Sequence, residues 1–505
     1  MNALPERLRQ PLLLRIISLL PEGVPVFLVG GAIRDALLNR AQYDLDFVTP
    51  GDAIKIARQL GDKIGAAYFP LDTERNMARL VLKPGAAQDN HEQHPIRIDF
   101  STYQGADLAS DLAAREFTIN AMAVEVHELQ TLVDPMGGLQ DLLAKRLKAC
   151  SERSFINDPV RILRAVRFSV ALELNIAPET VQLMRQAVVH LPTVSAERMR
   201  DELFRILIQS HPGTAIRLLD TLEALEYILP ETCLLKGVEQ SSPHILDAWE
   251  HTLDVLSRLE SILDVVAEEF KPDKASNLAL GLVSMQLGRY RPFLIEHLKS
   301  ALNPDRPQRG MLFLAGLYHD VGKRKTQTVD DEGKIRFIEH EHIGARLADR
   351  RGQLLKLSRL EIDRLVTIVK HHMRPSFLSH TEELPSRKAV YRFFRDTGAA
   401  GVDISLLSLA DMLATYGPTL PQERWNRHLE VVRELLHAWW EDREERVFPT
   451  PLIDGDQLMR TLDLSPGPVV GYLLETIREA QVAGDIHTTE EATSLGKTLL
   501  QEYRK

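Results

Sequence analysis

Two neighbouring stretches decide the fold of the first part of this chain: Val26-Phe-Leu-Val-Gly-Gly-Ala-Ile-Arg-Asp-Ala-Leu-Leu38 and Tyr43-Asp-Leu-Asp-Phe-Val48. The first predicts an apolar strand, a Gly-Gly turn and an amphipathic helix. The second predicts a strand that carries Asp44 and Asp46. Side chains at positions i and i+2 of a strand point to the same side of the sheet. We therefore expect the two carboxylates to face one site.

The same two stretches predict a chemistry. Two carboxylates on one side of a strand can hold Mg²⁺, which prefers carboxylates, water and substrate phosphates as ligands. Gly30 and Gly31 let the backbone approach a ligand closely, and the following helix offers N–H groups to a phosphate. A Gly-Gly turn or an Asp-x-Asp pair alone is more often an ordinary turn or solvated surface. Their close succession favours a metal and phosphate site for nucleotidyl transfer.

Composition limits the class of protein. The chain has 505 residues, of which 44% are hydrophobic, so it can form several domains. Its two cysteines, Cys150 and Cys233, provide no disulfide framework, which fits a reducing cytoplasm. The early apolar stretch from Leu12 to Leu20 is short and contains Arg15, so it predicts an amphipathic helix and no membrane span or signal. We expect a cytoplasmic protein without a membrane partner.

Charge is unevenly distributed along the chain. The net charge of −10 argues against general coating of nucleic acid. Between Lys145 and Phe168, however, seven basic residues stand against two acidic ones, Glu152 and Asp158. One basic strip on an acidic protein favours binding of a single, oriented polyanion such as an RNA.

Hydrophobic periodicity predicts an α+β protein. We expect a head with a small mixed β-sheet and helices over residues 1–150, and an all-α neck over 151–244. A second helical domain follows over 245–418, and a helical tail over 419–505. The predicted strands are Val26–Val29, Leu45–Val48, Arg79–Leu82, Ile96–Phe100 and Ala121–Val126, and the first predicted neck helices are Asp158–Leu172, Pro178–Val189, Ala196–Gln209 and Pro212–Leu225.

Four further motifs extend the pattern in order. They are Ile96-Arg-Ile-Asp-Phe, Asp111-Leu-Ala-Ala-Arg-Glu-Phe-Thr-Ile-Asn-Ala-Met-Ala, Asp134-Pro-Met-Gly-Gly-Leu-Gln-Asp-Leu and Asn157-Asp-Pro-Val-Arg-Ile-Leu-Arg-Ala-Val-Arg-Phe. With the two opening stretches, this ordered set resembles the bacterial class II tRNA nucleotidyltransferase and poly(A) polymerase family over nearly the whole chain. The resemblance implies that CTP and ATP are substrates and that CMP and AMP are added to the 3′ end of tRNA.

The resemblance also implies roles for individual residues. Asp44 and Asp46 would be the catalytic acids that hold Mg²⁺, and Asp99 is a candidate third carboxylate that is equally well an ordinary edge-strand aspartate. The implied mechanism is two-metal-ion phosphoryl transfer without a covalent intermediate. The implied nucleotide-binding residues are Gly30, Gly31, Arg34, Asp35, Arg115, Asn120, Asp158, Arg161 and Arg164.

The last three of these residues also suggest a way to choose the base. Pro159 suits the first turn of a helix with Asp158 as its N-cap, and Arg161 and Arg164 then follow at intervals of three along one side. A carboxylate accepts a proton from a base amino group, and a guanidinium donates to a ring nitrogen or carbonyl. Cytosine and adenine share this pattern, so one Asp–Arg pair could select both. The alternative is a capped helix with a solvated basic face.

Departures from the family pattern leave the product open. Ala114, Glu116 and Asn157 stand where the family usually has arginine, aspartate and glutamate. Only six residues separate Gln104 from Asp111, where full CCA-adding relatives carry a longer flexible loop. The short connection makes a CC-adding enzyme a real possibility and a poly(A) polymerase less favoured. A different alternative is a phosphohydrolase whose head only binds RNA.

The helical domain over 245–418 resembles an HD-type metal-dependent phosphohydrolase. The implied metal set is His251, His319, Asp320 and Asp411, and His340 with either His371 or His372 would add a second metal or bind phosphate; His372 is the residue we favour. Imidazole and carboxylate ligands suit a transition metal or Mg²⁺/Mn²⁺, with a bound water as nucleophile.

In relatives, such domains hydrolyse 2′,3′-cyclic phosphates or 2′-phosphates of RNA ends. His190, His211 and His244 have no partners at a recognisable spacing, and we interpret them as structural. The tail over 419–505 resembles the family region that touches the body of tRNA. The oligomeric state is open.

Overall fold

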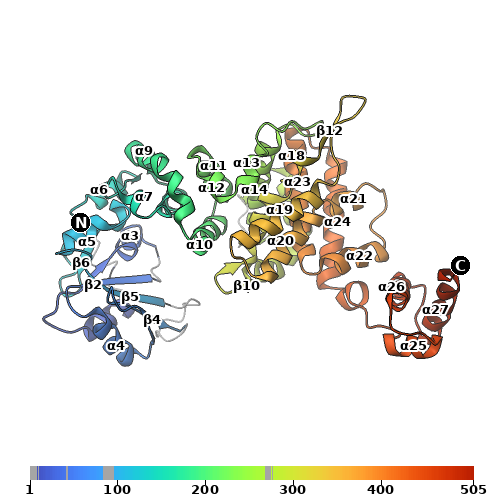
Figure 1. Ribbon diagram of the computed structural model, residues 1–505, viewed down its shortest axis with the longest axis horizontal. Coiled ribbons are helices and arrows are strands. Elements are labelled where there is room, and N and C mark those ends of the chain that lie inside the picture. Colours follow the sequence, from blue (N-terminus) through green and yellow to red (C-terminus); the bar gives the residue numbers. More distant parts are fainter. Residues whose placement is uncertain are drawn as a thin grey trace. The chain divides into compact units, whose positions relative to one another are not determined.

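The computed structural model describes residues 8, 11–40, 44–83, 96–267, 274–275 and 277–504. The chain forms two compact units, residues 1–195 with 221–227, and residues 196–220 with 228–505. The first unit contains the large β-sheet and the second is mainly helical (Figure 1). The protein therefore has the predicted α+β fold, with a mixed sheet near the N-terminus followed by helices.

The large sheet has seven strands in the order β3-β4-β5-β2-β1-β6-β7. β2 and β5 are parallel, and the other neighbours are antiparallel, so the sheet is mixed as predicted. In the parallel pair, Asp46 lies opposite Asp99. The strands are β1 (Phe27–Val29), β2 (Asp44–Thr49), β3 (Ala67–Asp72), β4 (Met77–Leu82), β5 (Ile96–Thr102), β6 (Ala123–Glu125) and β7 (Leu132–Val133).

All five predicted strands are present, whereas β3 and β7 were not predicted. β3 is an edge strand with mostly exposed side chains and contains Pro70. Proline cannot donate to a ladder and is tolerated at a sheet edge, so the apolar alternation that reveals a half-buried strand is missing there.

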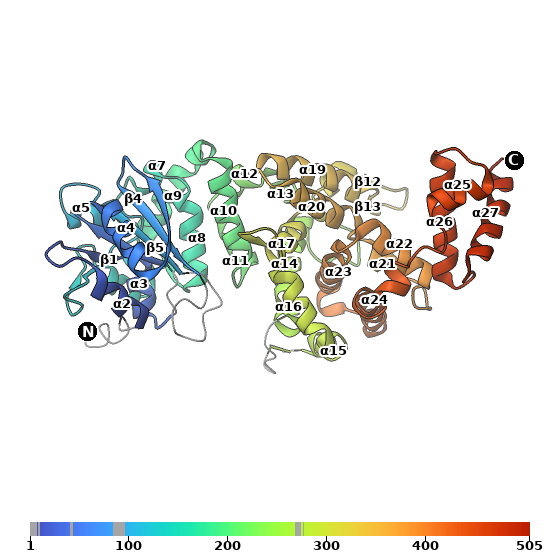
Figure 2. The same ribbon diagram turned by 90° about the horizontal axis from the view of Figure 1, so that it is seen from below.

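Helices pack on the sheet and continue beyond it. Helix α4 lies against β4 and β5 (Figure 2), and Asp52 caps its first turn by accepting from the backbone N–H of Lys55. The rings of Phe47 and Phe100 stack in the core. The helical segments of this unit are α2 (Pro11–Leu19), α3 (Gly31–Leu37), α4 (Ala53–Ile64), α5 (Leu108–Ala114), η1 (Thr118–Asn120), α6 (Gly138–Leu143), α7 (Ser154–Asn157), α8 (Arg161–Ala171), α9 (Pro178–Ala187) and η2 (Val188–Thr193), with the strand pair β8 (Arg146–Leu147) and β9 (Asn175–Ile176).

The predicted N-cap at Asp158 is wrong. Residues Ser154–Asn157 form the short helix α7, and Asp158 is its C-cap in an extended conformation. α8 begins only at Arg161, after a turn in which the Arg161 N–H donates to the Asp158 carbonyl. The residue before a proline is disfavoured in the helical region, and here Asp158 is extended, so the predicted helix Asp158–Leu172 begins three residues later than expected.

The second unit is built around the buried helix α23. α14 and α20 pack against α23, and α19 packs against α20. The small strand pairs β10 (Ala301–Asn303) with β11 (Arg306–Pro307) and β12 (Gln327–Val329) with β13 (Ile335–Phe337) are inserted between helices. The helical segments from residue 196 to the end of η6 are α10 (Ala196–Leu207), α11 (Pro212–Thr221), α12 (Leu225–Ile228), α13 (Pro230–Cys233), α14 (Ala248–Val266), α15 (Leu278–Leu287), η4 (Gly288–Tyr290), α16 (Arg291–Lys299), α17 (Gln308–Tyr318), α18 (Lys323–Thr326), α19 (His340–Leu354), α20 (Arg359–His371), α21 (Arg374–Leu378), α22 (Arg387–Thr397), α23 (Ala400–Tyr416), η5 (Gly417–Thr419), α24 (Gln422–Trp440) and the π-helical η6 (Arg443–Val447).

Three C-terminal helices, α25 (Gly455–Leu462), α26 (Pro468–Ala483) and α27 (Thr489–Tyr503), enclose a small core of their own (Figure 2). Glu479 of α26 accepts from Arg392 of α22 at 2.5 and 2.6 Å. Within the described residues, no single helix is long and apolar enough to cross a membrane. Residues 387–397 and 400–419 meet that criterion only as a pair bent by 107°.

Candidate active sites

Three acids gather on two adjacent strands of the first unit. Asp44 is exposed and Asp46 half-buried on β2, and Asp99 on β5 is the register partner of Asp46. Directly paired residues on neighbouring strands project from the same face, so the three carboxylates share one side of the sheet. Arg79 on β4 donates two hydrogen bonds to Asp99, both of 2.8 Å. The expected juxtaposition of the acids is present, and Arg79 is a member that sequence reasoning missed.

Gly30 brings an arginine to these acids. Its φ of +75° lies in the left-handed region, and a Cβ there would be 3.1 Å from Nη1 of Arg115 and 3.5 Å from Oδ2 of Asp46. Only glycine combines this backbone conformation with so little space. Asp111 accepts from Arg115 at 3.2 Å and so holds its guanidinium near the turn. A cationic side chain and a metal-type carboxylate thus lie next to the Gly-Gly turn.

The electrostatics of the acids suit a divalent cation. The pKa of Asp46 is raised to about 6, mainly by burial and also by Asp99 and Asp44, while Arg115 and Arg79 oppose the change. A carboxylate that ionises reluctantly beside two other carboxylates is stabilised by a bound cation. Oxygen ligands on adjacent strands fit the preferences of Mg²⁺. The donor set therefore fits the implied metal.

The predicted phosphate-binding residues form one hydrogen-bonded chain. Arg34 donates from Nη1 to Asn120 Oδ1 at 2.7 Å and also pairs with Asp35 at 2.9 Å. Asn120 in turn donates to Glu116 at 2.9 Å, and Glu116 accepts from Arg164 at 2.5 and 2.8 Å. Residues from α3, η1 and α8 are thereby fixed relative to one another.

Glu116, which departs from the family pattern, occupies the centre of this chain. Burial alone would raise the pKa of Glu116, but hydrogen bonds from Arg164 and Asn120 hold it below its ordinary value. The carboxylate is therefore ionised and orients both partners. Sequence reasoning did not assign Glu116 a role, because its partner Arg164 is 48 positions away.

The motif that begins at Asp134 packs against the segment that carries Asn120. Asp134 accepts from the N–H groups of Gly138 and Leu139 at the start of α6, and Asp141 accepts from Thr118 at 2.7 Å. A Cβ on Gly138 would lie 2.0 Å from the Thr118 carbonyl oxygen, so only glycine lets α6 approach η1 this closely. This contact positions the segment that carries Asn120.

The predicted base-selecting residues lie beside the same segment. Arg161 donates to Ser154 Oγ at 3.0 Å and to the carbonyl of Ala114 at 3.3 Å, and its Nε is 3.9 Å from Asp158. Ala114 directly precedes Arg115, so Arg161 contacts the segment that carries Arg115. The guanidinium of Arg34 also lies 5.0 Å from the ring centre of Phe168, a contact that the motif reading did not include.

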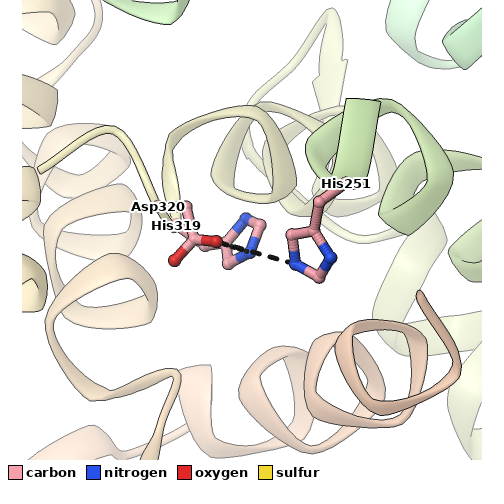
Figure 3. A group of neighbouring side chains, drawn as sticks. All are labelled: His251, His319 and Asp320. Carbon is pink, nitrogen blue, oxygen red and sulfur yellow. Dashed lines mark ion pairs between the residues drawn. The ribbon is translucent and has the colours of Figure 1, made fainter. Parts of the chain in front are cut away.

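The second unit brings the HD-motif residues together as two groups that share Asp320. His251, His319 and Asp320 form one group (Figure 3), and Asp320, His340 and His372 form the other. The shared carboxylate is 3.2 Å from His319 Nε2 through one oxygen and 3.4 Å from His340 Nε2 through the other. The fourth predicted ligand, Asp411, lies 3.0 Å from Nε2 of His251.

The two adjacent histidines differ in position: within the described residues, His372 belongs to one of the groups that could hold a metal, and His371 to neither. The Nε2 atoms of His372 and His340 are 3.3 Å apart. The Nδ1 atoms of His319, His340 and His372 each face a backbone carbonyl at 2.7 to 2.9 Å. Because Nδ1 of each ring faces a carbonyl, Nε2 is the nitrogen that each ring can offer to a metal.

Local packing and charge agree with a metal centre. A Cβ on Gly322 would lie 2.0 Å from the His340 carbonyl oxygen, so the glycine after the His-Asp pair lets His340 approach. Nε2 of His319 is buried without a hydrogen-bond partner, as expected for an atom that coordinates a metal. Burial alone would raise the pKa of Asp320, but His319 and Lys323 hold it well below its ordinary value. An ionised carboxylate among imidazoles fits the expected divalent cation, a transition metal such as Mn²⁺ or else Mg²⁺.

Two residues near this centre were not predicted. His244, which we had interpreted as structural, has its ring 5.2 Å from that of His251. Lys323 places Nζ 2.6 Å from both Asp320 and Gln240. Lys323 could have been identified from the sequence, because it follows Asp320 of the His-Asp pair by only three positions.

Family models match three parts of the chain. The "Poly A polymerase head domain" matches residues 26–148, the "Probable RNA and SrmB-binding site of polymerase A" matches residues 173–235, and the "HD domain" matches residues 248–411. The first match contains the paired acids and the third contains the His-Asp groups.

Similar proteins extend over almost the whole length. The A-adding tRNA nucleotidyltransferase of Deinococcus radiodurans is 32% identical over 483 residues, covering 94% of this chain and 95% of the relative. The CC-adding tRNA nucleotidyltransferase of Thermus thermophilus is 30% identical, covering 92% of each. The fold is also that of a CCA-adding enzyme solved in complex with CTP, with a TM-score of 0.63, 22% identity and coverage of 99% of this chain and 98% of that one. The chain therefore belongs to the tRNA nucleotidyltransferase family, which comprises CCA-adding enzymes and their CC- and A-adding relatives.

Proposed function

We propose that this protein adds CMP, and no AMP, to the 3′ end of tRNA from CTP, and so acts as a CC-adding enzyme. One observation carries this choice over full CCA addition: the connection between β5, which ends at Thr102, and α5, which begins at Leu108, is short and tied down. The N–H of Gln104 donates to Asp111 at 2.9 Å, and Asp107 caps the helix. The longer loop implied for the switch from C to A has no counterpart in this described segment.

The residues of the first unit supply the mechanism. Asp44 and Asp46 would hold Mg²⁺, which when bound activates the RNA 3′-hydroxyl and offsets charge on the leaving pyrophosphate. Arg115 and Arg34 would bind the phosphates beside the Gly-Gly turn through charge-assisted hydrogen bonds. Asp158 would accept from the base amino group while Arg161 donates to the base. Glu116 keeps Asn120 and Arg164 in place around the nucleotide.

The product is tested directly with three tRNA transcripts that end before the CCA sequence, after the first C, and after CC. Each is incubated with CTP, with ATP or with both, and the added residues are resolved at single-nucleotide length. We expect two C residues on the first transcript, one on the second and none on the third. Addition of A to the third transcript would establish CCA addition, or A addition if CTP is not used. Extended polymerisation from ATP alone would indicate a poly(A) polymerase.

We further propose that the second unit is an accessory phosphohydrolase for 2′,3′-cyclic phosphates or 2′-phosphates of RNA ends. The HD-domain match and the two ligand groups that share Asp320 support this role. Opening of a terminal 2′,3′-cyclic phosphate to a phosphate monoester, or release of inorganic phosphate from a terminal 2′-phosphate, dependent on Mn²⁺ and lost in His319→Ala, tests it. A cytoplasmic location stays a prediction.

A further inference from the structure

A cavity of about 470 Å³ lies beside the HD-motif residues in the second unit. Asp320, His340 and Asp411 form part of its lining, so anything bound in the cavity is adjacent to the proposed metal centre. This volume falls within the range of roughly 300 to 1,000 Å³ found for sites that bind small organic ligands. It is much larger than a single phosphate group requires.

The lining of the cavity is selectively basic. Apart from the proposed ligands Asp320 and Asp411, the charged residues among the described lining are Lys323, Lys334, Arg336 and Arg424. The whole chain carries a net charge of −10, so this concentration of cations opposes the overall balance. With divalent cations in the centre as well, the cavity would favour a ligand with more than one phosphate group.

The cations come from separate elements at different places around the centre. Lys323 lies at its edge, 2.6 Å from Asp320. Arg424 on α24 contacts the hydroxyl of Tyr416 and lies 5.6 Å from its ring centre. Lys334 stands at the hairpin of β12 and β13. Lys323 is therefore suited to the phosphate at the metal centre, and Arg424 and Lys334 to a second phosphate.

The remaining lining offers an apolar surface. Pro243, Phe337, Ile338, Met373 and Met412 line the cavity, and Ile338 is 70% exposed despite its large aliphatic side chain. The N–H of Ile335 donates to Ser241 Oγ at 2.7 Å, which joins the hairpin to the loop before α14. Apolar surface beside phosphate-binding groups suits a nucleoside, whose base and sugar can pack while its phosphates pair.

We propose that this cavity binds the last two nucleotides of an RNA 3′ end and selects an oligonucleotide over a mononucleotide. The terminal phosphate would lie at the group of His251, His319 and Asp320, and the terminal nucleoside would pack on the apolar lining. The preceding phosphodiester would pair with Arg424 and Lys334. The inference rests on the proposed phosphohydrolase function and adds to it a second phosphate subsite, with Arg424 as a specificity-determining residue.

The test compares hydrolysis of cytidine 2′,3′-cyclic phosphate with that of the dinucleotide CpC bearing the same terminal group, in the presence of Mn²⁺. We expect the full-length protein to show a kcat/KM about tenfold or more higher for the dinucleotide, as one charge-assisted contact can supply. Arg424→Ala should bring the ratio close to one. Arg433→Ala, on the same helix but outside the described lining, should keep it. Equal kcat/KM values for the two substrates in the unaltered protein would overturn the proposal.

A binding measurement separates this inference from the phosphohydrolase proposal. If neither substrate is hydrolysed, the Kd of CpC 3′-phosphate is measured for the unaltered protein, Arg424→Ala and Arg433→Ala. Weakening of about tenfold or more in Arg424→Ala alone would support the subsite even though the hydrolase assignment had failed. An unchanged Kd in Arg424→Ala, or tighter binding of CDP than of the dinucleotide, would refute the subsite.

Discussion

Asp46 and Asp99 lie directly opposite each other on the parallel strands β2 and β5. Arg79 neutralises Asp99 through two hydrogen bonds, whereas the pKa of Asp46 is raised to about 6, first by burial and then by its acidic neighbours. The two aspartates are thus unequal despite their matching positions. A bound metal would therefore stabilise the ionised form of Asp46 in particular.

The raised pKa of Asp46 predicts how this residue changes the free energy of unfolding when no metal is bound. Its folded-state pKa of about 6 exceeds the ordinary value of 3.8, so folding costs free energy as the pH rises through that interval, by up to about 3 kcal/mol above pH 6. In EDTA at pH 7, Asp46→Asn should therefore melt at a higher temperature than the unaltered protein, with the difference vanishing near pH 4. Mg²⁺ should then stabilise the unaltered protein but not the variant.

Asp62→Asn, at an exposed position of α4, provides the control for a change of charge alone. Thermal melting of the three proteins, with EDTA and with Mg²⁺, gives the comparison. A lower melting temperature for Asp46→Asn in EDTA would contradict the assigned electrostatics.

Glu116 should be needed for both stability and catalysis. Glu116→Gln removes the charge that pairs with Arg164 and is expected to destabilise the first unit by about 2–3 kcal/mol, because a partly buried cation is left uncompensated. Nucleotide addition should fall by about tenfold to a hundredfold as Asn120 and Arg164 lose their common anchor. Urea unfolding and a CTP incorporation assay measure the two effects. Glu74→Gln, at an exposed position, should change neither; an equal response of both variants would argue against the network.

The adjacent histidines of α20 and its C-cap offer a matched pair of variants. His372→Ala should lower the amount of Mn²⁺ bound to the second unit, because its Nε2 lies in the group with Asp320 and His340. His371→Ala should leave metal binding near that of the unaltered protein. CTP incorporation should be the same in both variants. Titration with Mn²⁺, followed by electron paramagnetic resonance, distinguishes them; greater metal loss in His371→Ala would reverse the assignment.

A buried histidine predicts acid sensitivity of the second unit. His428 lies between the hydroxyls of Ser379 and Ser408 at 3.1 and 3.0 Å, and burial lowers its pKa to about 4. In the unfolded chain the ring of His428 is protonated below about pH 6.5, whereas in the folded chain it stays neutral down to about pH 4. The contribution of His428 to the free energy of unfolding is therefore largest above pH 6.5. That stabilisation, about 3 kcal/mol, is lost as the pH falls toward 4.

The difference in melting temperature between the unaltered protein and His428→Gln, recorded from pH 7.5 to 4, isolates this effect from other titrating groups. The unaltered protein should lose its advantage progressively below pH 6.5. A difference that is constant over the whole range would show that His428 does not titrate differently on folding.

Sequence motifs predicted what is encoded locally. The Gly-Gly turn and the Asp-x-Asp strand are each set by a few consecutive residues, and the His-Asp pair lies within one turn of chain. Such patterns follow from periodicity and backbone preferences, so the mixed sheet, the helical second unit and most of the gathered side chains could be predicted.

Contacts between distant residues could not be predicted in this way. The pairing of Arg79 with Asp99 depends on which strands become neighbours, and the role of Glu116 depends on where α8 lies against η1. The later start of the predicted helix, at Arg161 and not at Asp158, arises because Asp158 is the C-cap of a short preceding helix. The basic lining around Arg424 is likewise assembled only by tertiary packing.

The most direct test of the account is CMP addition by Asp46→Ala. A tRNA transcript without its terminal CCA is incubated with CTP and Mg²⁺, using the unaltered protein, Asp46→Ala and the surface control Asp62→Ala, all with matched circular dichroism spectra. We expect two C residues from the unaltered protein and the control, and a loss of about a thousandfold or more in Asp46→Ala, since metal-stabilised charge supplies several kcal/mol to the transition state. Addition by Asp46→Ala at the unaltered rate would contradict the assignment of the paired acids as the metal site.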